Sequence, residues 1–551
     1  MSSIFDTSAI VKFKRKNTFD LSRENCFTCD VGQLIPVVCE PLVPGDIVRI
    51  SPSAIVKTAP MLAPVYGALE FDFHAFVVPL RLLWKDFSDW IFDNESTLVP
   101  PHVRLEYLIA EGFRTTNDYL GLGQNKNIHS DRELNVFKFL GYFQIWKEYF
   151  RDEDLQDYPD FLDDNTISDY NSYYQAFHDF WTKPLLRCWR KDYFTSARPW
   201  AQKGTPPLLS VFDDNAKAPL TYNGKYDIPG AVGDNANILF PSISLPYTHA
   251  TDVPADMGFF AGVGTDSSNL GDPYASAHYG TTLRPGQAAN WFVDLAANSQ
   301  GVSVEMLRAL FAMQRFQELE AVAGSRYIEG TLAFWGERVK DSRAQVPEFI
   351  GMCSQYIHVD EVVQNSETDV TVQGHRTGQG STAFVGKTFK YYSTEYGLLY
   401  VLASIRPKAT YFNAIPRFWR QLDQFDFPFP IFQHLGEQEI LQSELDIASA
   451  SSDDDLEHTF GYQSRYAEYR SARDEVHGDF CGSLDFWHFA RKLAQPQLDE
   501  NFVTIQPNVQ SQFNRIFAVT GENTNHFWIE SYFHFKVKRR LKFHSVPTLI
   551  G

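Results

Sequence analysis

Residues 532–544, YFHFKVKRRLKFH, decide the fold of this chain. Their charged and apolar side chains alternate with a period of two, and Arg539 is the only break in the pattern. Because alternating side chains point to opposite faces of a β-strand, the stretch predicts a half-buried strand with a basic outer face. The basic face comprises His534, Lys536, Lys538, Arg540, Lys542 and His544, and the apolar face comprises Phe533, Phe535, Val537, Leu541 and Phe543.

The charge of the whole chain bears on what this basic face does. The 551 residues contain 49 Lys and Arg against 68 Asp and Glu, a net charge of −19. This balance argues against a protein that coats nucleic acid on all sides. A solvated strand face is the alternative interpretation. A cationic strip on an otherwise acidic protein nevertheless favours contact with a polyanion on that face only.

Aromatic residues make up 15% of the chain, a composition that favours strands and allows a large apolar core. Strand patterns occur near both chain ends. Residues 68–78 alternate Leu69, Phe71 and Phe73 with polar neighbours, whereas residues 396–405 are apolar on both sides and predict a central strand. The expected strands are 34–39, 47–51, 68–78, 388–392, 396–405, 517–520 and 527–544. First and last strands that pair, with long insertions between them, are typical of a jelly-roll sandwich.

The middle of the chain reads as helices and long loops. Helical spacing predicts helices over 80–91, 133–150 and 303–324, the last with Ser303 as N-cap, Gly324 after its end and its Met residues in the core. Residues 204–300 are rich in Gly, Pro, Asn and Asp, which predicts long surface excursions. Residues 449–457 predict an exposed acidic loop.

The motifs of common enzymes are missing or defective. GSTAFVGKT (380–388) has five residues between its glycines instead of the four of a phosphate-binding loop, and a strand-like segment follows it. The CxxC of Cys26 and Cys29 lacks the second ligand pair of a zinc site. The six scattered cysteines suggest a reducing compartment, and no apolar run or leader predicts membrane insertion or secretion. We therefore expect no enzyme activity, no metal and no cofactor.

Several segments resemble, in collinear order, the major capsid proteins of microviruses, in particular the gokushovirus-like single-stranded DNA bacteriophages. The first is TFDLSRENCFTCDVGQLIPVVCEPLVPGDIV (18–48), and the last is VPTLIG (546–551). Residues 204–300 match the family less well. The segments between are FHAFVVPLRLLW (73–84), EYFRDEDLQD (148–157), the block 325–352, HLGEQEIL (434–441), GYQSRYAEYRSARDEVHGDF (461–480) and SLDFWHFA (483–490).

The resemblance implies an eight-stranded antiparallel jelly-roll β-barrel with long, partly helical insertions. Sixty copies would assemble through pentamers into a T=1 icosahedral shell around circular single-stranded DNA. The implied partners are a DNA pilot protein, a small basic DNA-binding protein and a host-cell surface receptor. The protein would be made in the bacterial host cytoplasm and reside in the virion.

Together these interpretations divide the chain into a basic arm, residues 1–17, and one jelly-roll capsid domain, residues 18–551. Insertions are expected at about 100–300, with 204–300 as a candidate surface protrusion, and at about 440–515. The candidate DNA-facing residues are Lys12, Lys14, Arg15, Lys16, His534, Lys536, Lys538, Arg540 and Lys542. A jelly-roll carbohydrate-binding module and, on the defective GKT alone, a nucleotide-dependent enzyme are the alternative functions.

Overall fold

The computed structural model of the chain describes residues 16–92, 97–109, 112–125, 127, 130–205, 207, 220–222, 291–293, 304–363, 365, 374, 376–447, 450, 452–507, 513–521 and 524–543. By internal contacts the chain divides into two units, residues 1–204 with 317–551, and residues 205–316. The predicted protrusion at 204–300 falls almost wholly outside the described residues. The predicted domain division stays a prediction.

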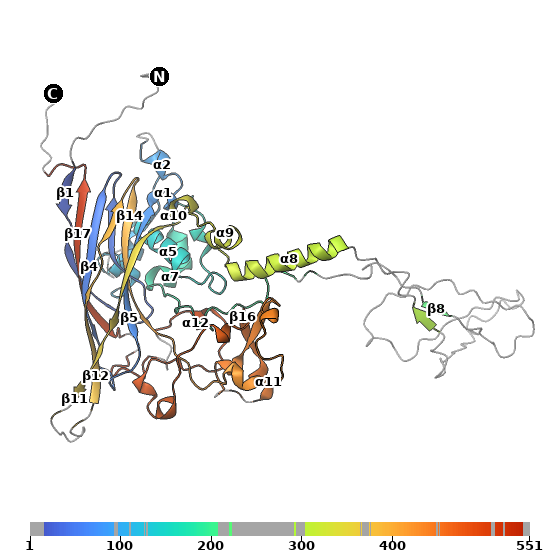
Figure 1. Cartoon of the computed structure of the whole chain (residues 1–551). Coiled ribbons are helices and arrows are strands. Elements are labelled where there is room, and N and C mark those ends of the chain that lie inside the picture. The colour runs from blue at the N-terminus through green and yellow to red at the C-terminus, as the bar shows by residue number, and fades with distance from the viewer. Residues whose placement is uncertain are drawn as a thin grey trace, which may run out of the picture. The chain divides into compact units, whose positions relative to one another are not determined.

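The first unit is built around two antiparallel sheets (Figure 1). The larger has the order β1-β17-β4-β12-β11, with β2 also paired to β17 and β13 to β4, and the smaller has the order β10-β5-β14-β3. The larger sheet contains β1 (Asn17–Asp20), β2 (Arg23–Cys29), β4 (Ile47–Thr58), β11 (Val359–Val363), β12 (Arg376–Val385), β13 (Phe389–Tyr392) and β17 (Phe527–Arg539). The smaller contains β3 (Ile35–Leu42), β5 (Leu69–Pro79), β10 (Glu348–Ile357) and β14 (Gly397–Pro407).

Strand β17 confirms the alternation predicted for the C-terminal stretch. Every second side chain from Phe527 to Val537 is buried, and those between them are exposed. The strand ends at Arg539 rather than at residue 544, because the Arg539 guanidinium turns inward to Asp46 (2.8 Å) and the Pro41 carbonyl (2.6 Å). Leu541 and Phe543, expected on the apolar face, are therefore exposed.

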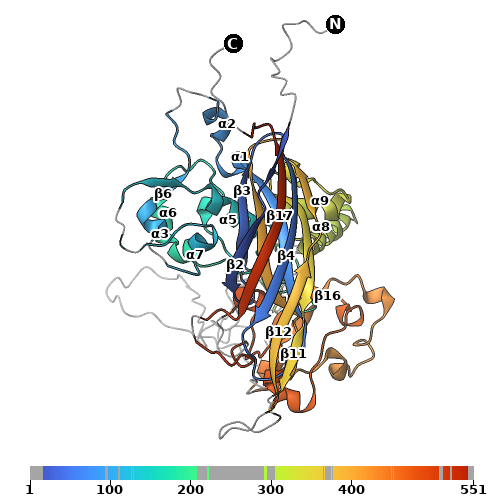
Figure 2. The same ribbon diagram turned by 90° about the vertical axis from the view of Figure 1, so that its left-hand side faces the viewer.

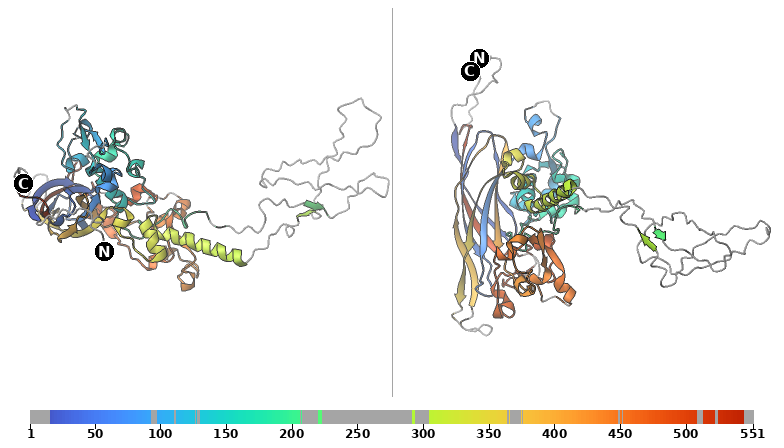
Figure 3. Two further views of the ribbon diagram at one scale, coloured as in Figure 1. Left: turned by 90° about the horizontal axis from the view of Figure 1, so that it is seen from above. Right: turned by 45° about the vertical axis from the view of Figure 1, so that its right-hand side comes forward.

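The space between the two sheets is a dense apolar core. Aromatic rings from both sheets meet there, as between Phe73 and Phe533, whose ring centroids lie 5.6 Å apart. Looking along the strands, the left panel of Figure 3 shows the sheets curving around this core. Within the described residues, the hydrogen-bonded ladders of this sandwich form two separate sheets, so they do not close the predicted barrel. The expected strand at 517–520 is only an isolated bridge from Phe517 to Met61.

A second apolar core lies on the other side of the smaller sheet, under helices α5 and α7 (Figure 1). This layer buries β14 on both faces, which confirms the expectation from residues 396–405. It also buries Asp72 and His74 of β5, which the alternation had placed on a polar face. Burial, together with the neighbouring Arg187, lowers the pKa of His74 to about 3.

The predicted helices are present, with four differences. The helix predicted over 133–150 begins at Phe137, because Glu133–Asn135 form a short strand that pairs with His102–Arg104. The segment 80–91 forms two short helices because Trp84 is extended between them, and residues 453–457 form a helix capped by Ser452 instead of a loop. Met306 and Met313 are about half exposed rather than in the core. The α-helices are α1 (Leu80–Leu83), α2 (Phe87–Trp90), α3 (Leu105–Ile109), α4 (Thr116–Tyr119), α5 (Phe137–Tyr149), α6 (Asn171–Ala176), α7 (His178–Thr182), α8 (Val304–Ala323), α9 (Tyr327–Trp335), α10 (Asp341–Ala344), α11 (Asp453–Glu457) and α12 (Glu500–Val503).

Gly324 follows α8 with φ of +90°, as predicted, whereas Ser303 lies outside the described residues. A third apolar core packs Phe194 and Ala197 against the insertion near 440–503. Short two-stranded sheets complete the fold. They are β6 (His102–Arg104) with β7 (Glu133–Asn135), β8 (Leu220–Tyr222) with β9 (Trp291–Val293), and β15 (Glu437–Leu441) with β16 (Thr459–Ser464).

The contact between α5 and β14 predicts that alanine substitutions at two helical glycines change the free energy of unfolding in opposite directions. A Cβ at Gly141 would overlap the buried Tyr400 hydroxyl, which donates to the Lys138 carbonyl (2.8 Å), whereas a Cβ at Gly330 in α9 meets nothing within 4 Å. We expect Gly141→Ala to lower the free energy of unfolding by about 1–3 kcal/mol through overpacking. The control Gly330→Ala should raise it by up to about 1 kcal/mol. Denaturant titration checks both, and a stabilising Gly141→Ala would contradict the packing.

Candidate nucleic-acid interface

The candidate site is the outer face of the larger sheet, onto which Figure 2 looks directly. Strand β17 crosses this face between β2 and β4, and no helix lies in front of them. The pleat that buries Phe533, Phe535 and Val537 sends the side chains between them outward. The exposed side chains of β17 are Trp528, Glu530, Tyr532, His534, Lys536 and Lys538.

Three cations form a row across neighbouring strands. Lys536 of β17 lies opposite Arg49 of β4, and Arg49 lies opposite Lys390 of β13. All three side chains are exposed. Directly opposite side chains have Cβ atoms about 4.5–5.5 Å apart, and like charges at that spacing repel each other. A bound polyanion would relieve this repulsion, so the row has the character of a phosphate-binding surface.

The row has an acidic neighbour on β1. Asp20 of β1 lies opposite Lys536 on the other side of β17. Hydrogen bonds from Ser22 lower the pKa of Asp20, and the nearby Lys536 lowers it further. This carboxylate therefore stays ionised and marks the limit of the basic surface along the β1 edge.

The structure brings together some of the predicted DNA-facing residues. Lys538 is exposed beside the row, and His534 is exposed in register with Ser51. Lys16 donates to the Gly45 carbonyl (2.7 Å) at the turn before β4, and its Nζ lies 5.2 Å from the centre of the Tyr392 ring.

Two further candidates lie beyond the end of β17. Arg540 and Lys542 are exposed past the end of the strand, and the Arg540 guanidinium lies beside Gly45. Lys12, Lys14, Arg15 and His544 are outside the described residues. The candidate DNA-facing cations that the structure describes therefore gather around the end of β17 and the Gly45 turn.

Sequence reasoning missed Arg49 and Lys390. The alternation in IVRIS (47–51) and in FKYY (389–392) already placed both side chains on a polar face. What no local pattern supplied was the pairing of β4 with both β17 and β13, which sets the three cations side by side.

Aromatic side chains occupy the same face. Tyr392 is 52% exposed, Trp528 is 45% exposed and Tyr532 is 42% exposed. Single-stranded nucleic acid is commonly bound by cations that follow the backbone and by aromatic rings on which bases stack. Toward the Phe527 end of β17 the face becomes mixed, because Glu24 and Glu530 are also exposed there. The surface therefore offers phosphate contacts at one end and stacking along its length.

Arg539, the break in the alternation, is a structural residue rather than part of this face. Its Nε donates to Oδ2 of Asp46, a side chain with no solvent exposure, and the same oxygen accepts from the Val43 amide (3.1 Å). The pair fixes the end of β17 to the turn between β3 and β4, where Arg540 and Lys16 both lie beside Gly45.

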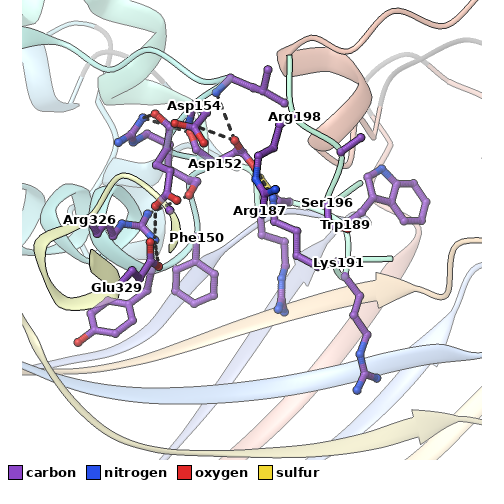
Figure 4. Close-up of a pocket in the computed structure, with 18 of the residues that line it drawn as sticks. Phe150, Asp152, Asp154, Arg187, Trp189, Lys191, Ser196, Arg198, Arg326 and Glu329 are labelled. Atoms are coloured by element: carbon purple, nitrogen blue, oxygen red, sulfur yellow. Dashed lines mark hydrogen bonds and ion pairs between the residues drawn. The ribbon is translucent and has the colours of Figure 1, made fainter. Parts of the chain in front are cut away.

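A separate cavity of about 480 Å³ lies behind the smaller sheet (Figure 4). Several of its charged side chains form ion pairs: Arg187 binds the buried Asp72 (2.7 Å), and a guanidinium nitrogen of Arg326 lies 3.3 Å from a carboxylate oxygen of Glu153. Burial and the neighbouring Glu153 carboxylate raise the pKa of Glu329 to about 7. The arrangement joins the helical insertion to the sheet through ion pairs, and its lining contains no nucleophile held by a base.

Two further features concern the part of the chain that the structure describes. There, no group of three or more His, Cys, Asp or Glu side chains could hold a metal ion. None of the helices described has both the length and the apolar composition to cross a membrane.

Comparison with known proteins agrees with the resemblance found in the sequence. The model of a family described as capsid protein (F protein) matches residues 8–549. The capsid protein VP1 of Chlamydia phage 1 is 28% identical over 585 residues, covering 97% of this chain and 96% of the relative. VP1 of Spiroplasma virus 4 is 28% identical, and the match covers 94% of this chain and 93% of the relative. VP1 of Bdellovibrio phage phiMH2K is 27% identical, and the match covers 95% of this chain and 93% of the relative.

The different environments of Arg539 and Lys538 predict different effects of removing each charge. Arg539→Gln leaves the buried Asp46 without its cation and should lower the free energy of unfolding by about 3 kcal/mol. The control Lys538→Gln removes an exposed charge and should change it by less than about 0.5 kcal/mol. Urea denaturation of the purified subunit measures both, and equal losses would contradict the assigned roles.

Proposed function

Because the chain belongs to the F protein family of capsid proteins, we propose that it is the shell subunit of a bacteriophage and assembles as a T=1 icosahedron around circular single-stranded DNA. The family is structural rather than enzymatic, and the relatives are capsid proteins of microvirus type. The shell geometry, the number of copies in the shell and the enclosed genome are what we propose beyond membership of this family.

The strand order supports a jelly-roll fold for the subunit. In the larger sheet, β1 and β2 both pair with β17, and β12 and β13 both pair with β4. If each such pair is taken as one interrupted strand, each sheet has four main positions, with β11 as an addition at the edge of the larger one. Neighbouring positions come from opposite parts of the chain, as Greek-key connections require.

The observation that carries the DNA-binding part is the row of Lys536, Arg49 and Lys390. These cations lie on an open sheet face of a protein whose net charge is −19. An enclosed genome needs contacts that do not depend on base sequence, and phosphate neutralisation with base stacking meets that need. We therefore orient this face toward the interior of the shell.

The remaining partners follow from the family resemblance alone. We propose pentamers as assembly intermediates, a DNA pilot protein and a small basic DNA-binding protein inside the particle, and a host-cell receptor outside it. Production and assembly are assigned to the bacterial host cytoplasm, and the mature location to the virion.

The first test is assembly itself. The full-length chain, expressed in bacteria with its genome, should form uniform icosahedral particles by electron microscopy. These particles should protect circular single-stranded DNA from nuclease. A small discrete oligomer without enclosed DNA would contradict the proposal and favour a binding module.

The second test removes the cationic row. The triple variant Arg49→Gln, Lys390→Gln and Lys536→Gln should bind single-stranded oligonucleotides more weakly. Loss of three phosphate contacts should reduce the slope of log K against log salt by about 2. Fluorescence anisotropy of the subunit at several salt concentrations measures this slope.

The matched control for this test removes the same number of positive charges from another part of the surface. Lys85, Arg190 and Lys340 are exposed and lie outside the two sheets, so their replacement by Gln should leave the salt slope unchanged. Equal slopes for the two triple variants would show that the sheet face does not bind DNA.

A further inference from the structure

An exposed aromatic segment, residues 417–435, has no covering element in the described chain. Its sequence is RFWRQLDQFDFPFPIFQHL, and it contains two 3-10 turns, Arg417–Arg420 and Pro430–Phe432. It belongs to the orange part of the chain near β16, at the margin of the unit in Figure 2. More than half exposed are the side chains of Phe418, Trp419, Leu422, Phe425, Ile431 and Leu435.

The arginines and the large apolar side chains of this segment are placed opposite to those of an ordinary surface loop, whereas its carboxylates, Asp423 and Asp426, are exposed. Its arginines face inward, where Arg417 lies 3.3 Å from the buried Glu444 and donates to the Glu439 carbonyl (2.6 Å), and Arg420 donates to the Leu456 carbonyl (3.1 Å). The large apolar side chains face outward. A subunit that worked alone in water would lose stability from this arrangement, since apolar surface gains free energy only when buried.

The segment is also held in one conformation. The Asp426 carboxylate accepts from the Leu422 and Asp423 amides (3.0 and 2.8 Å), and these backbone bonds lower its pKa. The Tyr469 hydroxyl donates to Gln421 (3.0 Å). Rings within the segment touch, as between Phe425 and Phe432 at 6.1 Å. Such preorganisation lowers the entropy cost of docking.

The exposed apolar area matches that of a stable interface. With about 200 Å² for a fully exposed large apolar side chain, the six side chains together expose roughly 850 Å². The largest apolar patch of an ordinary monomer is about 300–600 Å². A standard protein–protein interface buries about 800 Å² on each partner.

We propose that residues 417–435 dock against a second copy of this chain and form a main contact between subunits of the shell. This inference rests on the proposed assembly. Two copies that each carry a charge of −19 repel each other, so a contact between them needs an apolar surface. The aromatic segment meets this requirement.

The experiment compares two variants of the full-length chain. In Trp419→Glu with Leu422→Glu, charges enter the centre of the segment, and we expect folded dissociated subunits with loss of the shell peak in sedimentation. The control Phe113→Glu changes a side chain that is 80% exposed on a different part of the surface and should assemble like the wild type. Shells formed by the double variant would overturn the inference.

A labelling measurement covers the case in which the double variant does not fold. In a Cys26→Ser background, Leu422→Cys should react rapidly with a maleimide in dissociated subunits and lose this reactivity in shells. Equal reactivity in dissociated subunits and in shells would mean that no second copy covers the segment. Protection in both states would mean that another part of the same chain covers it. Either result overturns the inference. A wild-type chain that forms no shells would instead refute the proposed function itself.

Discussion

The strict alternation of buried and exposed side chains along β17 is the constraint on which the structure depends. This strand is hydrogen-bonded on both sides, to β4 from Phe527 to Lys538 and to β2 and β1 in succession. A shift of one residue would turn Phe533 and Phe535 to solvent and Lys536 into the core. The same pleat therefore sets both the packing of the sandwich and the position of the cations.

The charged residues of the chain fall into two groups with different roles. The buried Arg187 and the partly buried Arg539 pair with carboxylates that have no solvent exposure, Asp72 and Asp46, and hold insertions and turns to the sheets. Exposed cations such as Lys536 lie on an open face among like charges. Buried pairs are costly to break because the remaining charge cannot reach water, whereas exposed charges are free to bind an external anion.

The two candidate surfaces would bind their partners through different interactions. The sheet face combines cations and aromatic rings, which suits a flexible polyanion without regard to base sequence. The segment 417–435 turns its arginines inward and its large apolar side chains outward, which suits a rigid protein partner. A subunit that encloses a genome needs one surface of each kind.

The sequence by itself determined the elements whose patterns are local. Period-two alternation identified β17, an apolar run identified β14 as central, and Gly324 marked the end of α8, since each depends only on neighbouring residues. Tertiary structure decided what depends on pairing between distant segments: the row of Lys536, Arg49 and Lys390, the burial of Asp72 and His74, and the end of β17 at Arg539. These features arise from strand register and from layers packed across hundreds of residues, and no local window contains either.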